Sequence, residues 1–399
     1  MRKPITMACL FLLLLVVLTG CWNRRELNEL AIAVAMGVDK KDNDYLVSIQ
    51  IVNPGAVAAQ RAGTDTAPVI TYSTQGTSIF EALRRTTTKS PRKIYLSHMQ
   101  VIVLGKEVAE EGIAKVLDFL SRDHEFRTDF FLVVSKDATA EEILKTLTLL
   151  EKIPANKMFH SLQSSNTAWA ATGKATLDKL ISDMTSEGKH PVLTGITLDG
   201  AKDIAGTKEN MQRIDSRALL RYEGLAVFKK DKLVGWLNEE ESKGYNYIQN
   251  EVKSTAEYVA CPNGGNIALE IIRTNSEMKG KVVRKKPEVA IEVRVEANIS
   301  EVQCNMDLAK DKTIRGLEAK AAEKIKGFMQ QAISKAQHKY KADIFGFGEA
   351  VHRAEPGFWK KEKQNWDEEF VGLDVDMRVD FNIRGLGTIS NSYLETKEE

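Results

Sequence analysis

The stretch "VAIEVRVEANI", residues 289–299, alternates between apolar and mostly charged side chains. Successive side chains of a β-strand point to opposite faces, so this alternation separates the two kinds of residue. The two sets are Val289, Ile291, Val293 and Val295 on one side and Glu292, Arg294 and Glu296 on the other. The pattern predicts a strand in a sheet that has one buried face and one solvated face.

Neighbouring segments extend this strand into a domain. Strands are predicted at 255–261 and 267–273 with the turn signal "CPNGGN" between them, so the three strands form an antiparallel meander. The alternating stretch "LDVDMRVDFNIRG", residues 373–385, is expected to join the same sheet, which is predicted to be antiparallel. A helix of about thirty residues, about 45 Å long, is expected to cover the dry face. Its apolar stripe consists of Ile314, Leu317, Ala321, Ile325, Phe328, Ala332, Ala336, Tyr340 and Ile344.

Earlier in the chain, predicted strands and helices alternate, which is typical of a layered α/β domain. The expected strands are 31–39, 45–52, 69–73, 99–104 and 130–134, and the expected helices are 78–87, 107–121 and 140–147. From about residue 151 two helices are followed by strands at 190–198, 218–228 and 233–236, a polar loop at 200–216 and a helix at 239–247. The fold class is therefore mixed α/β (α+β), in three sequential segments: 21–150, 151–250 and 251–399.

The first twenty residues have the parts of a secretory signal peptide: a basic start at Arg2 and Lys3, then a mostly apolar run to Leu18. A membrane-spanning helix needs about twenty apolar residues, and this run is shorter. The sequence Leu-Thr-Gly-Cys at 18–21 resembles the bacterial lipobox. This resemblance implies removal of residues 1–20 and attachment of diacylglyceryl and N-acyl groups to Cys21. The alternative is an uncleaved anchor with an incidental cysteine.

A lipidated Cys21 would hold the mature protein on the membrane without a spanning helix, because two or more acyl chains give stable attachment. Arg24 and Arg25 would then lie at headgroup level, where basic residues are attracted to anionic lipid. The other interpretation is that they are solvated or paired with Glu26 and Glu29.

Charge and cysteine content exclude some classes. The formal net charge of the whole chain is +1, and it falls to −1 without Arg2 and Lys3, which argues against general binding of nucleic acid. Of the four cysteines, Cys9 lies in the leader and Cys21 is the lipid acceptor. Cys261 and Cys304 remain, and an exported protein can oxidise them to a disulfide. Two small buried thiols are the alternative.

No catalytic signature is found. The six histidines are scattered, without the spacing of a zinc site. No nucleophile elbow and no phosphate loop occurs. Gly346-Phe347-Gly348 begins like a dinucleotide fingerprint, but Val351 stands where the third glycine belongs. We interpret these glycines as a tight bend between helices. The sequence therefore favours binding or assembly over catalysis, with no metal and no cofactor other than the covalent lipid.

Four blocks in order resemble the Ger(x)C family, the lipoprotein C subunits of germinant receptors in endospore-forming bacteria. The terminal blocks are "GCWNRRELNELAIAVAMGVDK" at 20–40 and "DIFGFGEAVHRAEPGFWKKEKQNWDEEF" at 343–370. The inner blocks are "SHMQVIVLG" at 97–105 and "RYEGLAVFKKDKLVGWL" at 221–237. Asn23 departs from the aspartate expected after the tryptophan. At the level of the family, the halves run from about 22 to 200 and from about 220 to 390.

The resemblance implies a non-catalytic receptor subunit on the outer face of the spore inner membrane. Its partners would be the membrane-spanning A and B subunits, with which it would act in nutrient-triggered germination. Residues expected to touch a partner are Arg24, Arg25, Glu26, Asp343, Phe345, Trp359 and Trp366. Alternatively, the aromatic residues of this set pin the corner of the long helix to the sheet. A second class is a solute-binding lipoprotein of a transporter, which needs two similar lobes around a deep cleft, and the sequence shows no internal repeat.

Overall fold

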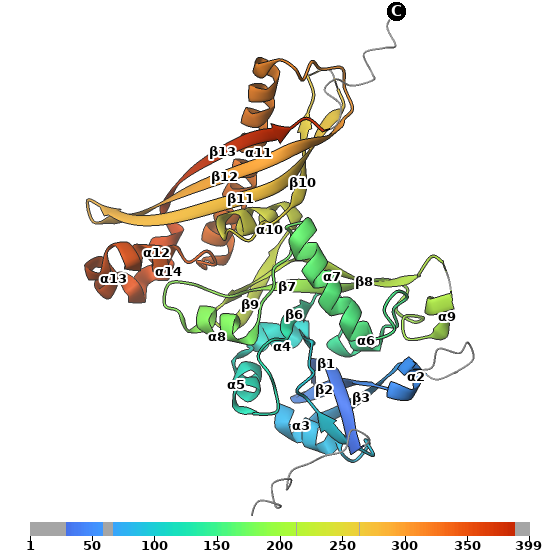
Figure 1. The fold of residues 1–399 in the computed structure, drawn as a ribbon. Coiled ribbons are helices and arrows are strands. Elements are labelled where there is room, and N and C mark those ends of the chain that lie inside the picture. Colours follow the sequence, from blue (N-terminus) through green and yellow to red (C-terminus); the bar gives the residue numbers. More distant parts are fainter. Residues whose placement is uncertain (1–28, 59–66, 213, 263, 388–399) are drawn as a thin grey trace, which may run out of the picture.

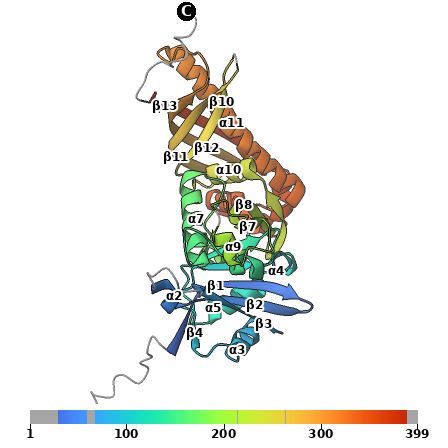
Figure 2. The same cartoon turned by 90° about the vertical axis from the view of Figure 1, so that its right-hand side faces the viewer.

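The structure is a computed structural model that describes residues 29–58, 67–212, 214–262 and 264–387. Two sheets stand at opposite ends of an elongated molecule, the first formed by the N-terminal part of the chain and the second by the C-terminal part (Figures 1 and 2). The mixed α/β fold predicted from the sequence is confirmed. Within the described ranges, no helix has both the length and the hydropathy that a bilayer crossing requires.

The larger sheet has nine strands, in the order β3-β2-β1-β5-β6-β7-β8-β9, with β4 paired to the start of β1. β1, β5, β6 and β7 run parallel, and β4 is also parallel to β1. β2, β3, β8 and β9 pair antiparallel with their neighbours. Every residue of β5 and β6 is buried, as expected for parallel strands covered on both faces. The strands are β1 (Leu30–Lys41), β2 (Asp44–Val52), β3 (Val69–Gly76), β4 (Lys93–Tyr95), β5 (Val101–Leu104), β6 (Phe131–Ser135), β7 (Val192–Gly200), β8 (Ala218–Lys229) and β9 (Lys232–Leu237).

Helices cover both faces of this sheet. Ile102 and Leu104 of β5 pack into one core with α3, α4, α5 and α8, while Val101 and Val103 pack into another with α6 and α7. The alternation of side chains along the strand explains this division. The helices are α2 (Pro54–Ala58), α3 (Ile79–Thr86), α4 (Lys106–Glu111), α5 (Ala114–Arg122), α6 (Ala140–Lys145), α7 (Pro154–Ala168), α8 (Leu177–Thr185) and α9 (Lys208–Gln212).

Two predictions for this half are wrong in detail. The single helix predicted at 107–121 is two helices, α4 and α5, separated at Gly112, whose φ of 136° is outside the helical range. The backbone N–H of Ile113 donates to the carbonyl of Asp231, so the β8–β9 turn occupies the break. The loop predicted at 200–216 contains the short helix α9.

The smaller sheet contains β10 (Thr255–Ala260), β11 (Asn266–Val283), β12 (Lys286–Val302) and β13 (Asp374–Gly385), in that order. The alternation predicted for 289–299 is confirmed, because its apolar side chains are buried while Arg294 is exposed. The long helix is also confirmed. α11 (Asp311–Ser334) continues through a π-helical turn, Lys335–Tyr340, and buries its apolar stripe against the sheet.

Two features of this sheet differ from the prediction. β13 pairs with β12 in parallel, because α11 carries the chain back to the end of the sheet where β12 began. The sheet is therefore mostly antiparallel, with one parallel pair. β11 extends to Val283, ten residues past the predicted end, since its polar second half still pairs with β12.

Three short helices follow the long helix and lie beneath the β11–β12 hairpin in Figure 1. They are α12 (Phe347–Ala354), α13 (Pro356–Glu362) and α14 (Trp366–Val371), and a 3-10 turn, Lys363–Asn365, joins the last two. Gly346 has a φ of 79° and immediately precedes α12, which confirms the predicted tight bend. The connection between the two sheets is α10 (Glu239–Ile248).

Cys261 and Cys304 form a disulfide in the structure, with their Cα atoms 6.5 Å apart. Cys261 follows β10 and Cys304 follows β12, and both side chains are buried. The oxidation state of these two cysteines in the cell stays a prediction. The three-segment division also stays a prediction, although one sheet contains strands from both sides of residue 150.

Candidate functional site

The chain after the long helix folds around the carboxylate of Asp343, which is fully buried. Oδ1 accepts the backbone N–H groups of Phe345 at 3.0 Å and Gly346 at 2.9 Å. Oδ2 accepts the backbone N–H of Gly348 at 2.8 Å and the indole N–H of Trp366 at 3.0 Å. Burial raises the pKa of Asp343, and these N–H donors oppose the rise. Asp343 thus fixes the corner between α11 and α12.

The aromatic residues of this corner pack on one another. Phe345 stacks on Phe347 with ring centroids 5.0 Å apart, and Trp359 meets Trp366 edge to face at 5.3 Å. The exposed fractions of Phe345, Trp359 and Trp366 are 3%, 5% and 2%. These rings therefore stabilise the corner from within. Their contact with a partner stays a prediction, and such a partner would meet the surface above them rather than the rings.

A loop of the N-terminal half, residues 186–191, meets this corner. The backbone N–H of His190 donates to the carbonyl of Asp343 at 2.7 Å. The Nδ1 atom of His190 accepts the backbone N–H of Lys230 at 3.1 Å, so the ring proton is on Nε2 and points to Asp367 Oδ1, 3.0 Å away. Lys229 Nζ contacts Asp367 Oδ2, also at 3.0 Å. Burial opposes ionisation, but His190 and Lys229 lower the pKa of Asp367 to about 2.

Two glycines let the halves approach closely. A Cβ on Gly188 would lie 2.8 Å from the backbone of Gly348 and 2.9 Å from the ring of Trp359. A Cβ on Gly348 would lie 2.7 Å from the Cα of Gly188. Both positions therefore require glycine for steric reasons. We call this contact, formed by residues 186–191 and 229–230 on one side and 341–348 and 359–367 on the other, the junction.

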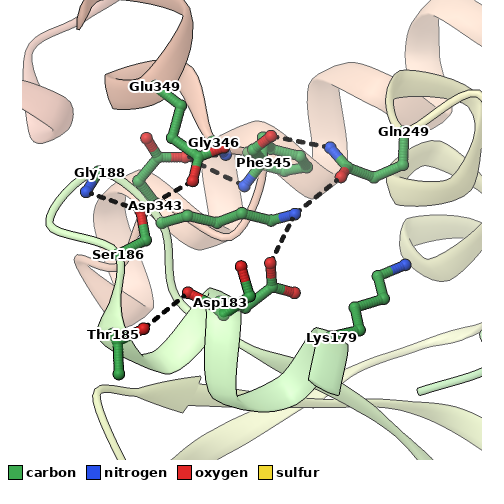
Figure 3. Close-up of polar contacts among 12 residues, drawn as sticks. Lys179, Asp183, Thr185, Ser186, Gly188, Gln249, Asp343, Phe345, Gly346 and Glu349 are labelled. Atoms are coloured by element: carbon green, nitrogen blue, oxygen red, sulfur yellow. Dashed lines mark hydrogen bonds and ion pairs between the residues drawn. The ribbon is translucent and has the colours of Figure 1, made fainter. Parts of the chain in front are cut away.

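A second polar network extends the junction toward α8 and α10 (Figure 3). Lys189 Nζ lies 3.1 Å from Asp183 Oδ1 and 3.4 Å from Gln249 Oε1. The amide of Gln249 donates to the carbonyl of Phe345 at 2.8 Å. Burial raises the pKa of Asp183, and Lys189 opposes that rise. α8, α10 and the Asp343 corner are thus linked by one lysine and one amide.

The long helix makes a separate contact with the first sheet. The hydroxyl of Tyr340 accepts the backbone N–H of Trp236 at 3.0 Å and donates to its carbonyl at 2.7 Å. Apolar packing continues across the same boundary, since Leu225 and Val227 of β8 belong to the core of the C-terminal half. The two halves therefore share hydrogen bonds, ion pairs and buried apolar surface.

The polar groups of the junction are engaged with one another, and little open space lies beside them. The charged groups of the junction face one another, and the cavity beside it, lined by Asp183, Tyr245 and Glu251 among others, has a volume of only about 20 Å³. Within the part of the chain that the structure describes, no three His, Cys, Asp or Glu residues form a group able to hold a metal ion. What the junction does is hold two halves in one orientation.

The sequence-predicted site residues fall into two groups. Asp343, Phe345, Trp359 and Trp366 come together at the junction. Cys21, Arg24, Arg25 and Glu26 lie outside the described residues. Sequence reasoning missed His190 and Gly188, because His190 lies 177 residues from Asp367 and neither belongs to a recognised spacing. The only available signal was the Trp366-Asp367 pair within the tail block.

Comparison with known proteins defines the class. The family described as "Spore germination protein N-terminal domain" matches residues 23–198. The family described as "Spore germination B3/GerAC like, C-terminal" matches residues 223–387. Spore germination protein KC of Bacillus subtilis (strain 168) is 33% identical over 98% of each chain. Fold and sequence together therefore define a spore germination protein. The chain belongs to the GerAC/GerKC family, the C subunits of germinant receptors.

More distant relatives match along the same length. Spore germination protein A3 of Bacillus subtilis (strain 168) is 23% identical over 96% of this chain and 98% of its own. The crystal structure of the GerBC protein superimposes with a TM-score of 0.54 at 18% identity, over 87% of this chain and 96% of that one. This structural similarity shows a shared fold.

Proposed function

We propose that this chain is a lipid-anchored, non-catalytic subunit of a germinant receptor. In this proposal it lies on the outer face of the spore inner membrane and acts there with the A and B membrane subunits. The observation that carries the proposal is the similarity to spore germination protein KC over 98% of both chains. The lipobox-like sequence ending at Cys21 adds the means of attachment.

The hydrogen bonds and ion pairs of the junction support a role in binding partner proteins rather than in catalysis. Asp343 is surrounded by N–H donors, and Asp367 is held between His190 and Lys229. A general acid or base needs access to a substrate proton, and these carboxylates are already engaged by the protein. The carboxylates that most resemble catalytic residues therefore act as structural connections between the halves.

The alternative of a solute-binding lipoprotein is less well supported. Such a protein closes two lobes around its ligand, so the boundary between the halves must hold a cleft. The boundary here is bridged by the ion pairs Lys229–Asp367 and Lys363–Glu187 and by a continuous apolar core, with a cavity of about 20 Å³ beside it. That volume has room for about one water molecule.

Substitution of the lipid acceptor tests the proposal. Cys21→Ala is expected to move the protein from the membrane fraction of spores to the soluble fraction and to reduce nutrient-triggered germination. Cys9→Ala, a change within the leader, is the control and is expected to alter neither. A Cys21→Ala protein that stays with the membrane, or that leaves it while germination remains normal, would contradict the proposal.

The partners require their own measurement. Affinity purification of the intact protein from detergent-solubilised spore membranes is expected to recover the A and B subunits. Recovery of the protein without either subunit, under conditions that preserve other membrane complexes, would refute the partnership.

A further inference from the structure

A basic segment lies on the end of the N-terminal half that is farthest from the smaller sheet. The sequence "RRTTTKSPRK", residues 84–93, contains five basic residues and no acidic residue. It runs from the end of α3 through an exposed turn into β4, at the lower end of the molecule in Figure 2. We call the side chains of this segment the basic surface, which consists of Arg84, Arg85, Lys89, Arg92 and Lys93.

Part of this charge is not neutralised by the protein. Arg85 pairs with Glu81 at 2.7 Å, and Lys93 pairs with Glu125 at 2.5 Å. Arg84 has no carboxylate partner among the described residues and lies over the ring of Phe80, 4.8 Å from its centroid. Arg92 is exposed and has no ion pair within the same ranges. The guanidinium groups of Arg84 and Arg92 are therefore available to bind an anion. The carboxylates of Asp343 and Asp367 at the junction, in contrast, are already engaged by the protein.

Apolar side chains accompany these cations. Phe80 is 50% exposed and Ile70 is 44% exposed. Each lines a hollow. The first has a volume of about 440 Å³ and includes Phe80, Arg84 and Lys93. The second has a volume of about 220 Å³ and includes Ile70 and Arg92. The rim of the larger hollow also carries Asp118, Asp123 and Glu125, of which Asp118 pairs with Arg122 and Glu125 with Lys93. Among the described residues, Arg92 is the one charged residue that lines the smaller hollow. The surface therefore combines apolar hollows with the unpaired guanidinium groups of Arg84 and Arg92.

The chain enters the fold at the same place. Leu30, the first residue of β1, pairs with Lys93 of β4, and the next residue, Ala31, lines the smaller hollow with Arg92. Cys21 precedes Leu30 by nine residues, which span at most about 30 Å when fully extended. A lipid on Cys21 would therefore keep Leu30, and with it the Lys93 end of the basic surface, within about 30 Å of the bilayer.

We propose that the basic surface docks on an anionic lipid bilayer and so determines which end of the protein faces the membrane. The bilayer is the occupant that fits best, because it supplies negative charge to Arg84 and Arg92 and an apolar interior to the exposed Phe80. This inference rests on the proposed lipid anchor, since the anchor brings this end of the protein to the membrane.

Sedimentation with lipid vesicles tests the inference. The mature chain with Cys21→Ala, which has no lipid, is mixed with vesicles of phosphatidylcholine alone or with added phosphatidylglycerol. We expect binding only to the anionic vesicles, and a fall in binding as salt increases. Each basic residue near the surface raises the partition coefficient for anionic vesicles about fivefold. The variant R84E/R85E/R92E is therefore expected to weaken vesicle binding by about a hundredfold or more.

A matched control has the same change in charge elsewhere. R284E/K285E/K286E alters three adjacent basic residues at the tip of the β11–β12 hairpin, on the other sheet, and is expected to bind like the parent. The variants R84Q/R85Q/R92Q and R284Q/K285Q/K286Q repeat the comparison without charge reversal. The salt dependence of the parent needs no substitution, so the test does not depend on the folding of any variant.

Several results would overturn the inference. They are equal binding to neutral and anionic vesicles, equal losses in the two triple variants, and no binding to anionic vesicles at low salt. If R84E/R85E/R92E binds vesicles normally but no longer co-purifies with the receptor subunits, the surface belongs to a protein partner and not to lipid. A lipidated protein that stays in the membrane fraction while its unlipidated form ignores anionic vesicles would refute only this inference, not the proposed anchor.

Discussion

The junction and the basic surface both contain charged side chains, but the charges are buried and engaged at the junction and exposed on the basic surface. At the junction, Asp343 is fully buried and accepts four N–H groups, and Asp367 lies between His190 and Lys229. On the basic surface, Arg92 is exposed and has no ion pair among the described residues. A buried carboxylate is tolerated only when it is hydrogen-bonded or paired, so these contacts at the junction are structural. Exposed, unpaired charge remains free for a ligand.

This contrast predicts that substitutions at the junction change stability and leave membrane binding intact, while those at the basic surface do the reverse. The largest effect is expected at Asp343. Asp343→Ala leaves four N–H groups without their acceptor, and each buried unsatisfied group costs about 1 to 3 kcal/mol. The free energy of unfolding, measured with urea, should fall by about 4 kcal/mol or more. Asp376→Ala, an exposed site on β13, is the control and should cost under about 0.5 kcal/mol. Similar losses for both variants would refute the structural role of Asp343.

Close packing at the junction predicts the next effect. Gly188→Ala forces a methyl group to within 2.8 Å of the backbone of Gly348, so the two halves must move apart. Overpacking of this kind typically costs about 1 to 3 kcal/mol. At Gly357 in α13, no atom lies within 4 Å of an added Cβ, so Gly357→Ala should be neutral or slightly stabilising. Thermal unfolding of both variants measures the difference, and equal melting temperatures would show that the approach of the halves is not tight.

The contacts of Asp367 with His190 and Lys229 predict a dependence on pH. The pKa of Asp367 is lowered from 3.8 to about 2 in the folded protein, so its contribution is present above the unfolded pKa. That contribution is lost as the pH falls from about 4 to about 2, because the unfolded chain takes up the proton first. The side chain is 35% exposed, so solvent screening limits the contribution to about 1 kcal/mol.

Urea unfolding of the parent and of Asp367→Asn between about pH 2 and pH 7 measures this contribution. The two curves should differ at neutral pH and converge in acid. A difference that grows in acid would have the wrong sign and would contradict the assignment.

The smallest effect on stability is expected at the basic surface. Arg84, Arg85 and Arg92 are exposed, and the one ion pair among them, Arg85 with Glu81, is exposed as well. R84E/R85E/R92E should therefore change the free energy of unfolding by only about 0.5 kcal/mol. A loss comparable to that of Asp343→Ala would show that these arginines support the fold, and the contrast between the two regions would fail.

The sequence predicted what depends on local periodicity. The alternation at 289–299 and the apolar stripe of α11 are repeated signals, and both elements were predicted correctly. The parallel pairing of β13 was missed because alternation identifies a strand but not its direction. The second half of β11 was missed because its side chains are mostly polar and their pairing partner lies elsewhere in the chain.

The junction was the hardest feature to predict. The tail block pointed to Asp343 and Trp366, but nothing in it indicated that the carboxylate of Asp343 would accept the indole N–H of Trp366. The contact of His190 with Asp367 depends on how the two halves pack against each other. A single sequence does not indicate which residues of the two halves meet. Gly188 was overlooked for the same reason. A side chain at position 188 is excluded only because Gly348 of the other half lies so close to it.

The central claim is that lipid on Cys21 holds a non-catalytic body beside the membrane. Mass spectrometry of the N-terminal peptide of the native protein tests it most directly. We predict a peptide that begins at Cys21 and carries the mass of a diacylglyceryl group and an N-acyl chain. An unmodified leader that begins at Met1, or a free Cys21 thiol in the membrane-bound protein, would contradict the claim.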